Sequence, residues 1–242
     1  MATRSVDKSA SASQSPVLIV AAMSRELGAL RRKRPAGISI IETGEGMKNA
    51  ADALGRWFEK NNASAVVATG FAGALSPQLQ IGDMVIAREI HAGNQVISVK
   101  ESNLLRAVER VKIDNRAIHF GVAITVDQII VTAEAKRRLA EGFARNEIAC
   151  VDMESFAVAQ ECSRRGIPFL IVRAITDAMN EDLPVDFNRC RAADGRINSL
   201  RVMRAALARP RAIKGWSRLM ERSDFCADSL AEFVARVVKE IN

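Results

Sequence analysis

The sequence contains no tyrosine and only two histidines, and it has no long run of apolar residues. With His91 and His119 alone, a histidine-dependent catalytic triad or a histidine-rich zinc site is disfavoured. The longest unbroken apolar run, from Val17 to Met23, is far shorter than a membrane-spanning helix requires. Proteins that bind nucleic-acid bases stack them on aromatic rings set among basic residues, so the missing tyrosines argue against nucleic acid as a partner.

Cysteine is also sparse and is not arranged for metal binding. The four cysteines show no Cys-x-x-Cys spacing, which predicts a reduced, cytoplasmic protein without a metal site. No cofactor is expected. Residues 1–15 are rich in serine and alanine and lack the apolar segment of a signal peptide. We therefore expect a disordered tail over residues 1–15 and one domain over residues 16–242.

The positive charge is concentrated toward the C-terminal end. The chain has a formal net charge of +7, and residues 189–222 alone hold ten Lys or Arg against two acids. Apolar residues recur at helical spacing on both sides of Pro210, so this basic segment is predicted to be helical with a break there. Two interpretations stay open. The segment is either a basic amphipathic helix on an anionic membrane surface, which would make the protein peripheral to the membrane, or it docks on the protein with its arginines in water.

Apolar runs of strand length alternate with helical patterns over most of the chain. This alternation predicts an α/β fold whose mostly parallel sheet has helices on both faces. Strands are expected at Val17–Ala22, Ile38–Thr43, Ala65–Thr69, Met84–Ala87, Val96–Val99, Val122–Val126, Ala149–Val151 and Phe169–Ile175. Helices are expected at residues 24–34, Met47–Asn61, Leu104–Val111, Ala133–Gly142 and in the segment that ends at Gly166.

Acids follow two of the buried strands at their carboxyl ends. Asp152 and Glu154 lie just after the strand that ends at Val151, and Asp177 follows the strand that ends at Ile175. Ligands bind at the carboxyl ends of strands in α/β sheets. Apolar surroundings raise the pKa of a carboxyl group, so such an acid can hold a proton at neutral pH. One acid alone could simply favour a helix N-terminus, but acids at two strand ends predict a site.

Two glycine clusters also follow predicted strands. Gly44-Glu45-Gly46 and Gly70-Phe71-Ala72-Gly73 lack the third glycine and the later acid of a dinucleotide-binding fingerprint. They either bring backbone N–H groups close to a ligand at the strand ends or form tight turns between strand and helix.

Four segments, in the right order, resemble the nucleoside phosphorylase and nucleosidase superfamily, which includes purine nucleoside phosphorylases and methylthioadenosine/adenosylhomocysteine nucleosidases. They are Ala21–Glu26, Thr69–Leu75 continued by Gly82–Val85, Val151–Glu154 and Val172–Asp177. The resemblance implies a phosphorylase/hydrolase-like, three-layer α/β/α sandwich with a mixed, partly barrel-like central sheet. It also implies a purine nucleoside substrate, water or phosphate as the second reactant, and a homodimer or a larger homo-oligomer.

Two features are similar to the hopanoid-associated phosphorylases within this superfamily, a group assigned the removal of adenine from adenosylhopane. One is Asp152–Ser155 with Ile167–Phe169 and Leu183-Pro184 after it, and the other is the basic C-terminal segment. This closer resemblance implies a role in hopanoid biosynthesis, with a 5′-modified adenosine as substrate and adenine as a product.

The acids match residues with defined roles in the superfamily. Asp177 matches the acid that protonates N7 of the purine, and Glu154 matches the acid that accepts hydrogen bonds from the ribose hydroxyls and stabilises an oxocarbenium-like transition state. Met153 matches the residue that packs on the sugar face. Glu26 matches the acid that activates water in the hydrolytic members. The alternatives are a surface acid for Glu26 and a core side chain for Met153.

The resemblance assigns further residues to two parts of the site. The substrate-binding part comprises Met153, Asp152, Thr176, Gly70, Phe71, Ala72, Gly73, Ile129 and Ile130, and the phosphate or water pocket comprises Thr43, Gly44, Arg25 and Thr69. Ala68 and Phe71 stand where the hexameric phosphorylases carry an arginine and a serine that grip phosphate, which favours hydrolysis. Ile129 and Ile130 stand where nucleosidases stack adenine on a phenylalanine, so aliphatic packing would replace the ring.

Two other functions stay open at this point. One is a phosphate-dependent purine nucleoside phosphorylase, and the other is a non-catalytic nucleoside-binding or storage protein on the same scaffold. The acids at positions 26, 154 and 177 argue against the second function.

Overall fold

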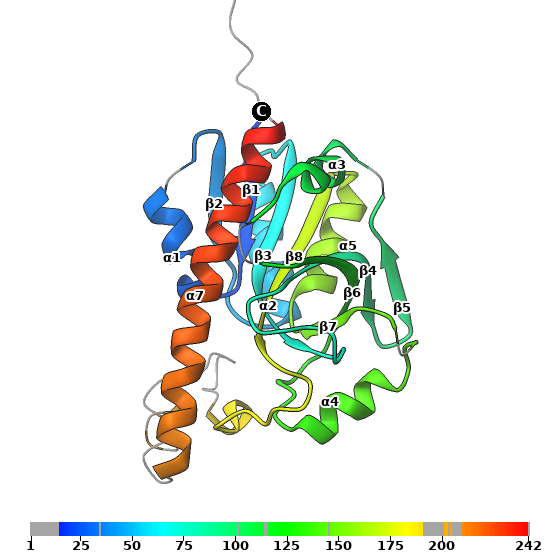
Figure 1. Ribbon diagram of the computed structural model, residues 1–242. Coiled ribbons are helices and arrows are strands. Elements are labelled where there is room, and N and C mark those ends of the chain that lie inside the picture. Colours follow the sequence, from blue (N-terminus) through cyan, green and yellow to red (C-terminus); the bar gives the residue numbers. More distant parts are fainter. Residues whose placement is uncertain are drawn as a thin grey trace, which may run out of the picture.

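The computed structural model describes residues 15–33, 35–100, 102–113, 116–144, 146–190, 201–202, 204 and 210–241. These residues form a mixed β-sheet with helices packed on both sides (Figure 1). None of the helices within these ranges is long and apolar enough to cross a membrane. The tail expected over residues 1–15 lies outside the described residues except at its last position, and so does most of the basic segment before Pro210.

The strands form one sheet, part of which closes on itself. They are β1 (Val17–Ala21), β2 (Ile38–Glu42), β3 (Ala65–Ala74), β4 (Met84–Ala92), β5 (Gln95–Ser98), β6 (Ile118–Thr125), β7 (Ala149–Asp152) and β8 (Phe169–Asp177). The pairs β3–β8, β8–β4, β4–β6, β6–β7 and β7–β3 complete a ring. β1 and β2 extend the sheet from β3 in parallel, and β5 adds an antiparallel edge to β4. The mixed, partly barrel-like sheet is therefore confirmed.

The helices begin and end where local chemistry favours it. They are α1 (Ser24–Lys33), α2 (Met47–Phe58), α3 (Asn103–Arg110), α4 (Ala133–Ala140), α5 (Ser155–Arg165), α7 (Pro210–Ile241) and the 3₁₀ helix η1 (Phe187–Cys190). The side chains of Ser102 and Thr132 accept backbone N–H groups at the starts of α3 and α4. α5 ends at Gly166 with a φ of 68°, a conformation that favours glycine. Pro210 is the first residue of α7, where its missing N–H costs least.

Alternate residues of the central strands face two separate hydrophobic layers. Val17 and Ile19 of β1 pack in the layer that includes α1, α3 and α7, whereas Leu18 and Val20 pack in the layer that includes α2 and α5. Strands buried on both faces read as continuous apolar runs, which is why the sequence located them. The three-layer α/β/α sandwich is confirmed.

Several strands, among them β3, β4 and β6, are longer than the apolar pattern predicted. β3 continues through the second glycine cluster to Ala74, so Gly70–Gly73 is strand backbone with a bulge near its end. The turn considered for these glycines is wrong, because β8 pairs with this part of β3 and keeps it extended. β6 begins at Ile118 rather than at Val122, since its first residues pair with the start of β4.

α7 is a helix of 32 residues that lies along α1 and the outside of the sheet (Figure 1). Its C-terminal half buries Phe233, Val234 and Val237 in the layer shared with α1. Its N-terminal half packs against Phe187 of η1 in a separate hydrophobic cluster. The helical character predicted for the chain after Pro210 is confirmed.

Candidate active site

The carboxyl ends of β1, β7 and β8 meet around one cavity of about 370 Å³. The end of β3 and the N-terminal half of α7 complete its wall. The predicted site residues that line the cavity are Arg25, Glu26, Phe71, Ala72, Gly73, Ile129, Ile130, Asp152, Met153, Glu154, Thr176 and Asp177. Thr43, Gly44, Thr69 and Gly70 are not among the lining residues. The fold thus brings the three predicted catalytic acids to one place from α1, from the junction of β7 and α5, and from β8.

Glu26 lies in the first turn of α1 and is only 4% exposed. The Met23 N–H donates to Oε2 at 2.9 Å, and the Phe71 N–H donates to Oε1 at 2.8 Å. Burial raises the pKa of Glu26 above its usual value, while the Phe71 N–H and the positive charge of Arg173 act in the opposite direction. The alternative of a solvated surface acid is therefore excluded.

Gly70 contributes to the site by having no side chain. A Cβ atom at this position would lie 2.7 Å from Oε1 of Glu26 and 2.8 Å from Nη1 of Arg173. Both charged groups are held by other hydrogen bonds, so they have little freedom to move away. This glycine therefore allows an acid and a cation to approach the strand backbone from one side.

Asp152 holds a buried arginine under the cavity. Arg173 Nε donates to Asp152 Oδ2 at 2.6 Å and to Ser155 Oγ at 3.2 Å, and the Ser155 hydroxyl donates to the same carboxylate oxygen. Thr125 Oγ1 donates to Oδ1 of Asp152 at 2.9 Å. Burial disfavours the charge of Arg173, but Asp152 and Glu154 outweigh this and raise the pKa of the guanidinium. Asp152 lines the cavity, yet both of its oxygens are already engaged by protein donors.

Glu154 stands at the N-cap position of α5, but its side chain makes no capping hydrogen bond. Its Oε1 instead accepts the N–H of Gly46 at 2.6 Å. Gly46 has a φ of 89°, which a residue with a side chain rarely adopts, so glycine suits the turn that presents this N–H. Burial, helped by the charge of Asp152, raises the pKa of Glu154 to about 8, against the opposing effects of Arg173 and the Gly46 N–H. The side chain faces the cavity, so helix capping is not its task.

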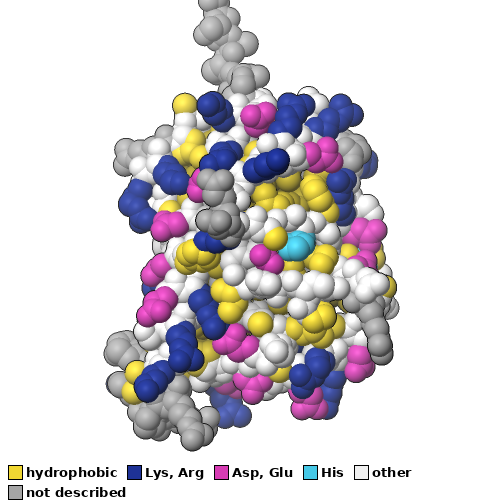
Figure 2. Space-filling model, in the orientation of Figure 1, with side chains coloured by type: hydrophobic (Ala, Val, Ile, Leu, Met, Phe, Trp, Pro, Cys, Tyr) yellow, Lys and Arg dark blue, Asp and Glu magenta, His cyan; other side chains and the backbone are white. Residues whose placement is uncertain are grey.

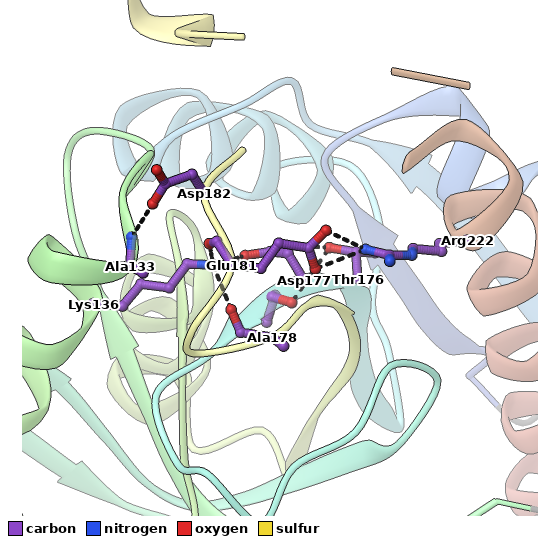
Figure 3. A network of polar contacts seen from close by, with 9 residues as sticks. Ala133, Lys136, Thr176, Asp177, Ala178, Glu181, Asp182 and Arg222 are labelled. Atoms are coloured by element: carbon purple, nitrogen blue, oxygen red, sulfur yellow. Dashed lines mark hydrogen bonds and ion pairs between the residues drawn. The ribbon is translucent and has the colours of Figure 1, made fainter. Parts of the chain in front are cut away.

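Asp177 is the last residue of β8, and its carboxyl group belongs to an ion pair. Lys136 Nζ lies 2.5 Å from Oδ2, and Thr176 Oγ1 donates to Oδ1 at 2.9 Å (Figure 3). Lys136 comes from α4 and its side chain is 0% exposed. The apolar surroundings expected for Asp177 from its strand are therefore wrong. The apolar residues lie along β8, but the groups that contact the carboxyl come from α4 and from the neighbouring threonine.

The predicted phosphate or water pocket is only partly assembled. Thr43 donates its hydroxyl to the Gly44 carbonyl at 2.9 Å, away from the cavity lining. The Thr69 hydroxyl is buried and has no hydrogen-bond partner within the described part of the chain. Arg25 lines the cavity, but its Nη1 donates to Asp224 of α7 at 2.6 Å. Among the described residues, this paired arginine is the one Lys or Arg side chain in the cavity wall.

One side of the cavity is apolar and includes α7. Trp216, Leu219 and Met220, which belong to the second apolar stripe of the basic segment, line the cavity and pack with Phe187. The rings of Trp216 and Phe187 have centroids 5.9 Å apart. This part of the stripe therefore docks on the protein, as the second interpretation of the basic segment expected. The first stripe lies mostly outside the described residues.

Asn188 fixes the loop that carries the predicted base pocket. Its Oδ1 accepts the N–H of Ile129 at 3.0 Å, and its Nδ2 donates to the Ile129 carbonyl at 2.9 Å. The Val131 carbonyl of the same loop accepts the N–H of Leu183. Ile129 and Ile130 are thus held at the cavity wall as an aliphatic surface.

Comparison with known proteins agrees with this geometry. A profile of the phosphorylase superfamily matches residues 33–208. The chain belongs to this superfamily. A methylthioadenosine/S-adenosylhomocysteine nucleosidase of Shewanella halifaxensis is 28% identical over 185 residues, which cover 69% of this chain and 79% of the relative. A second one, from Shewanella oneidensis, is 28% identical over 188 residues, with the same two shares.

Solved structures show the same fold at lower sequence identity. The nucleosidase of Neisseria meningitidis in complex with methylthio-immucillin-A superposes with a TM-score of 0.70 and 23% identity, covering 93% of this chain and 99% of that one. A protein of Borrelia burgdorferi described as a nucleosidase of this type, bound to adenine, has a TM-score of 0.72 and 18% identity, covering 92% and 99%. The α/β fold class is therefore shared with both structures.

Sequence reasoning missed four contributors to the site. Arg173 stands inside a motif that was recognised, but its pairing with Asp152 depends on how β7 and β8 are placed. Lys136 lies in a short helix of alternating charged and small residues, and nothing in that pattern marks it as buried. Trp216 lines the cavity, and Asn188 holds the loop of Ile129 at its wall, only because the chain returns there after β8.

Proposed function

We propose that the protein cleaves the N-glycosidic bond of a 5′-modified adenosine and releases adenine, with water as the second reactant. The observation that carries the proposal is the arrangement of Glu26, Glu154 and Asp177 around one cavity. Membership of the phosphorylase superfamily and the likeness to methylthioadenosine/S-adenosylhomocysteine nucleosidases support the same reaction.

Each acid has a distinct task in this reaction. Asp177 delivers a proton to N7 of the purine, so that adenine leaves as a neutral base; general acid catalysis of this kind supplies roughly 10²–10⁴-fold in rate. Glu154 accepts hydrogen bonds from the ribose hydroxyls and, when ionised, stabilises the positive charge that develops on the sugar. Glu26 accepts a proton from the attacking water, whose oxygen forms the new bond to the sugar carbon.

Water fits the cavity better than phosphate does. A phosphate dianion needs uncommitted cations or several free N–H donors. Arg25 is paired with Asp224, and the Phe71 N–H already donates to Glu26. Glu26 and Glu154 both face the cavity, and either of them would repel a phosphate dianion when ionised. Hydrolysis is therefore the favoured reaction.

The apolar wall favours an apolar group at the 5′ position. Leu183, Phe187, Trp216, Leu219 and Met220 line the cavity together, opposite the polar strand ends. Burying apolar surface there stabilises the complex by about 25 cal/mol per Å², so a substituent larger than a hydroxyl gains affinity. Adenosylhopane and methylthioadenosine both satisfy this requirement, the first with a large 5′ group and the second with a small one.

A membrane contact by the basic segment would depend on its positive charges and not on its apolar residues. Trp216, Leu219 and Met220 face the cavity and are not available to insert in a bilayer. Ile213 is 43% exposed, and basic side chains are scattered among acidic ones on the face shown in Figure 2. Sedimentation with anionic vesicles tests the contact: binding that declines as salt rises supports it, and no binding at low salt excludes it.

The experiment that tests the proposed reaction compares three substrates: adenosine, methylthioadenosine and an adenosyl lipid in detergent. Adenine release is followed with and without phosphate, and the sugar product is identified. We expect adenine and a free ribose derivative at a rate that phosphate barely changes, with adenosine as the poorest substrate. A strict phosphate requirement with a sugar 1-phosphate as product would show phosphorolysis instead.

A further inference from the structure

Lys136 lies directly behind Asp177, on the side away from the cavity. Its ammonium group is fully buried and has three hydrogen-bond acceptors around it. Nζ donates to the Ala178 carbonyl at 2.8 Å and to the Glu181 carbonyl at 2.9 Å, and it lies 2.5 Å from Asp177 Oδ2 (Figure 3). An ammonium carries three N–H bonds. Each of them therefore has one acceptor, and one of the three acceptors is the proposed proton donor.

The two carbonyls are fixed by contacts of their own segment with α4 and α7. The Ala133 N–H donates to Asp182 Oδ1 at 2.7 Å, and Arg222 Nη1 donates to both Glu181 oxygens at 2.8 Å (Figure 3). The acceptors are thus in place before any substrate binds. The two carbonyls accept two of the three N–H bonds of Lys136, so the third N–H bond points at Asp177.

A buried ammonium is costly for the fold. Desolvating a charge costs several kcal/mol per ion even when a partner is present. The cation contacts the one strand-end acid to which the proposed reaction gives a mobile proton, which points to a function in that reaction.

We propose that Lys136 supplies, through Asp177, the proton that the departing purine takes up. This inference rests on the proposed function, because it assumes that Asp177 protonates N7. In the free protein the pair is an ammonium and a carboxylate. When substrate fills the cavity and displaces water, the neutral pair of an amine and a carboxylic acid becomes more favourable, because a low dielectric disfavours separated charges.

The proton balance is complete without any other reactant. One N–H bond of Lys136 breaks and an O–H bond forms on Asp177. That O–H bond then breaks as the N7–H bond forms, while the electron pair of the glycosidic bond goes to the base. Lys136 keeps two N–H bonds, both already directed at the carbonyls of Ala178 and Glu181, and its lone pair faces Asp177. The proton released by the attacking water passes to Glu26 and then to solvent, and Lys136 recovers a proton from solvent.

The other ionisable groups around the pair come from two places, the segment after β8 and helix α7. Glu181 and Asp182 follow β8, Arg222 and Cys226 come from α7, and none of them lies between Lys136 and Asp177. Arg222 is paired with Glu181, and the Cys226 thiol contacts the Ile175 carbonyl, with a pKa raised by burial to about 12. The proton therefore has a direct route along the Lys136–Asp177 contact.

Three variants test the inference in single-turnover adenine release from methylthioadenosine between pH 6 and 10. Asp177→Asn removes the proton donor, Lys136→Met removes the proton supply, and Lys136→Arg keeps the charge but does not release a proton in this range. We expect all three to be slower than the parent by roughly 100-fold or more, the lower bound for a lost general acid. We also expect the alkaline limb of the rate profile to move to lower pH in Lys136→Met, because Asp177 must then carry its own proton.

The direction of that movement decides between the possible roles of Lys136. If the alkaline limb moves to higher pH, the lysine only opposes protonation of Asp177, and the inference is wrong. If Lys136→Arg restores the parent rate, charge alone is needed, which also overturns it. If Asp177→Asn releases adenine like the parent, the proposed function fails, whatever Lys136 does.

Lys136→Met leaves a carboxylate without its cation, and breaking one half of a buried pair can prevent folding. The double variant Lys136→Met/Asp177→Asn, which has no buried charge at this place, serves as the folding control. A measurement on the unmodified protein does not depend on folding of any variant: carbon NMR of labelled aspartate, assigned with Asp177→Asn. We expect Asp177 to be ionised in the free protein and to gain a proton when adenine is bound. An Asp177 that is protonated without adenine, or that stays ionised with it, would refute the inference.

Discussion

Glu154→Gln should make the protein more stable relative to the parent as the pH rises from about 4.5 to 8. The substitution keeps the size of the side chain and an oxygen that can accept the Gly46 N–H. The pKa of Glu154 is raised from its ordinary 4.5 to about 8 in the folded protein, chiefly by burial. The folded state therefore binds a proton that the unfolded state releases in this range, and the parent loses stability as the pH rises through it.

The size of the effect follows from the two values. The difference between 4.5 and about 8, at 1.36 kcal/mol for each pKa unit, gives roughly 5 kcal/mol in favour of the glutamine variant at pH 8. This is an upper value, because Glu154 lines the cavity and water there screens its charge. The advantage should vanish below pH 4.5, where the carboxyl group is protonated in both states.

Urea unfolding of parent and variant at pH 4.5, 6.5 and 8 measures the difference. Glu161→Gln is the matched control, because Arg165 and Arg164 lower the pKa of Glu161 against the effect of burial, so the sign is reversed. That variant should be less stable than the parent at neutral pH, and its deficit should shrink in acid. A stability difference for Glu154→Gln that does not change with pH would refute the reasoning about its burial.

Two further substitutions test other parts of the site. Gly70→Ala should lower adenine release at least 10-fold and destabilise the protein by about 1–3 kcal/mol, because its Cβ would lie under 3 Å from Glu26 and Arg173; Gly55→Ala, with nothing within 4 Å of its Cβ, should keep full activity. Trp216→Ala should raise KM for adenosines with an apolar 5′ group by roughly 10-fold, the effect of a pocket contact worth 1–3 kcal/mol, and leave adenosine itself nearly unchanged. Ile213→Ala, an exposed position on the same helix, should affect neither, and equal losses on both substrates in Trp216→Ala would remove the link to the 5′ group.

The sequence predicted the layers of the fold because β1, β3 and β8 are buried on both faces. Such strands appear as unbroken apolar runs, whereas the helices between them have apolar residues at helical spacing. The ring could not be inferred from these patterns. It depends on β8 pairing with both β3 and β4, and a pairing partner leaves no mark on the apolar pattern of a strand.

The acids of the site were predictable for a similar reason, since a charged residue at the end of an apolar strand stands out. Their partners were not. Lys136 lies on α4 among charged residues that face water, and its own pattern would place it there too. Trp216 belongs to a stripe that suits a membrane surface and a protein core equally well, and the choice depends on where α7 lies.

The nearby cations distinguish two of the cavity's acids from the other two. Four carboxyl groups, Glu26, Asp152, Glu154 and Asp177, face two buried cations, Arg173 and Lys136. Asp152 forms an ion pair with Arg173, and Asp177 forms one with Lys136. Each of these two acids therefore has a cation as its direct partner. Glu26 and Glu154 have only the more distant influence of Arg173, and burial raises the pKa of both. A positive charge that develops on a ribose between them would favour their ionised forms, so the transition state itself would supply the missing counter-charge.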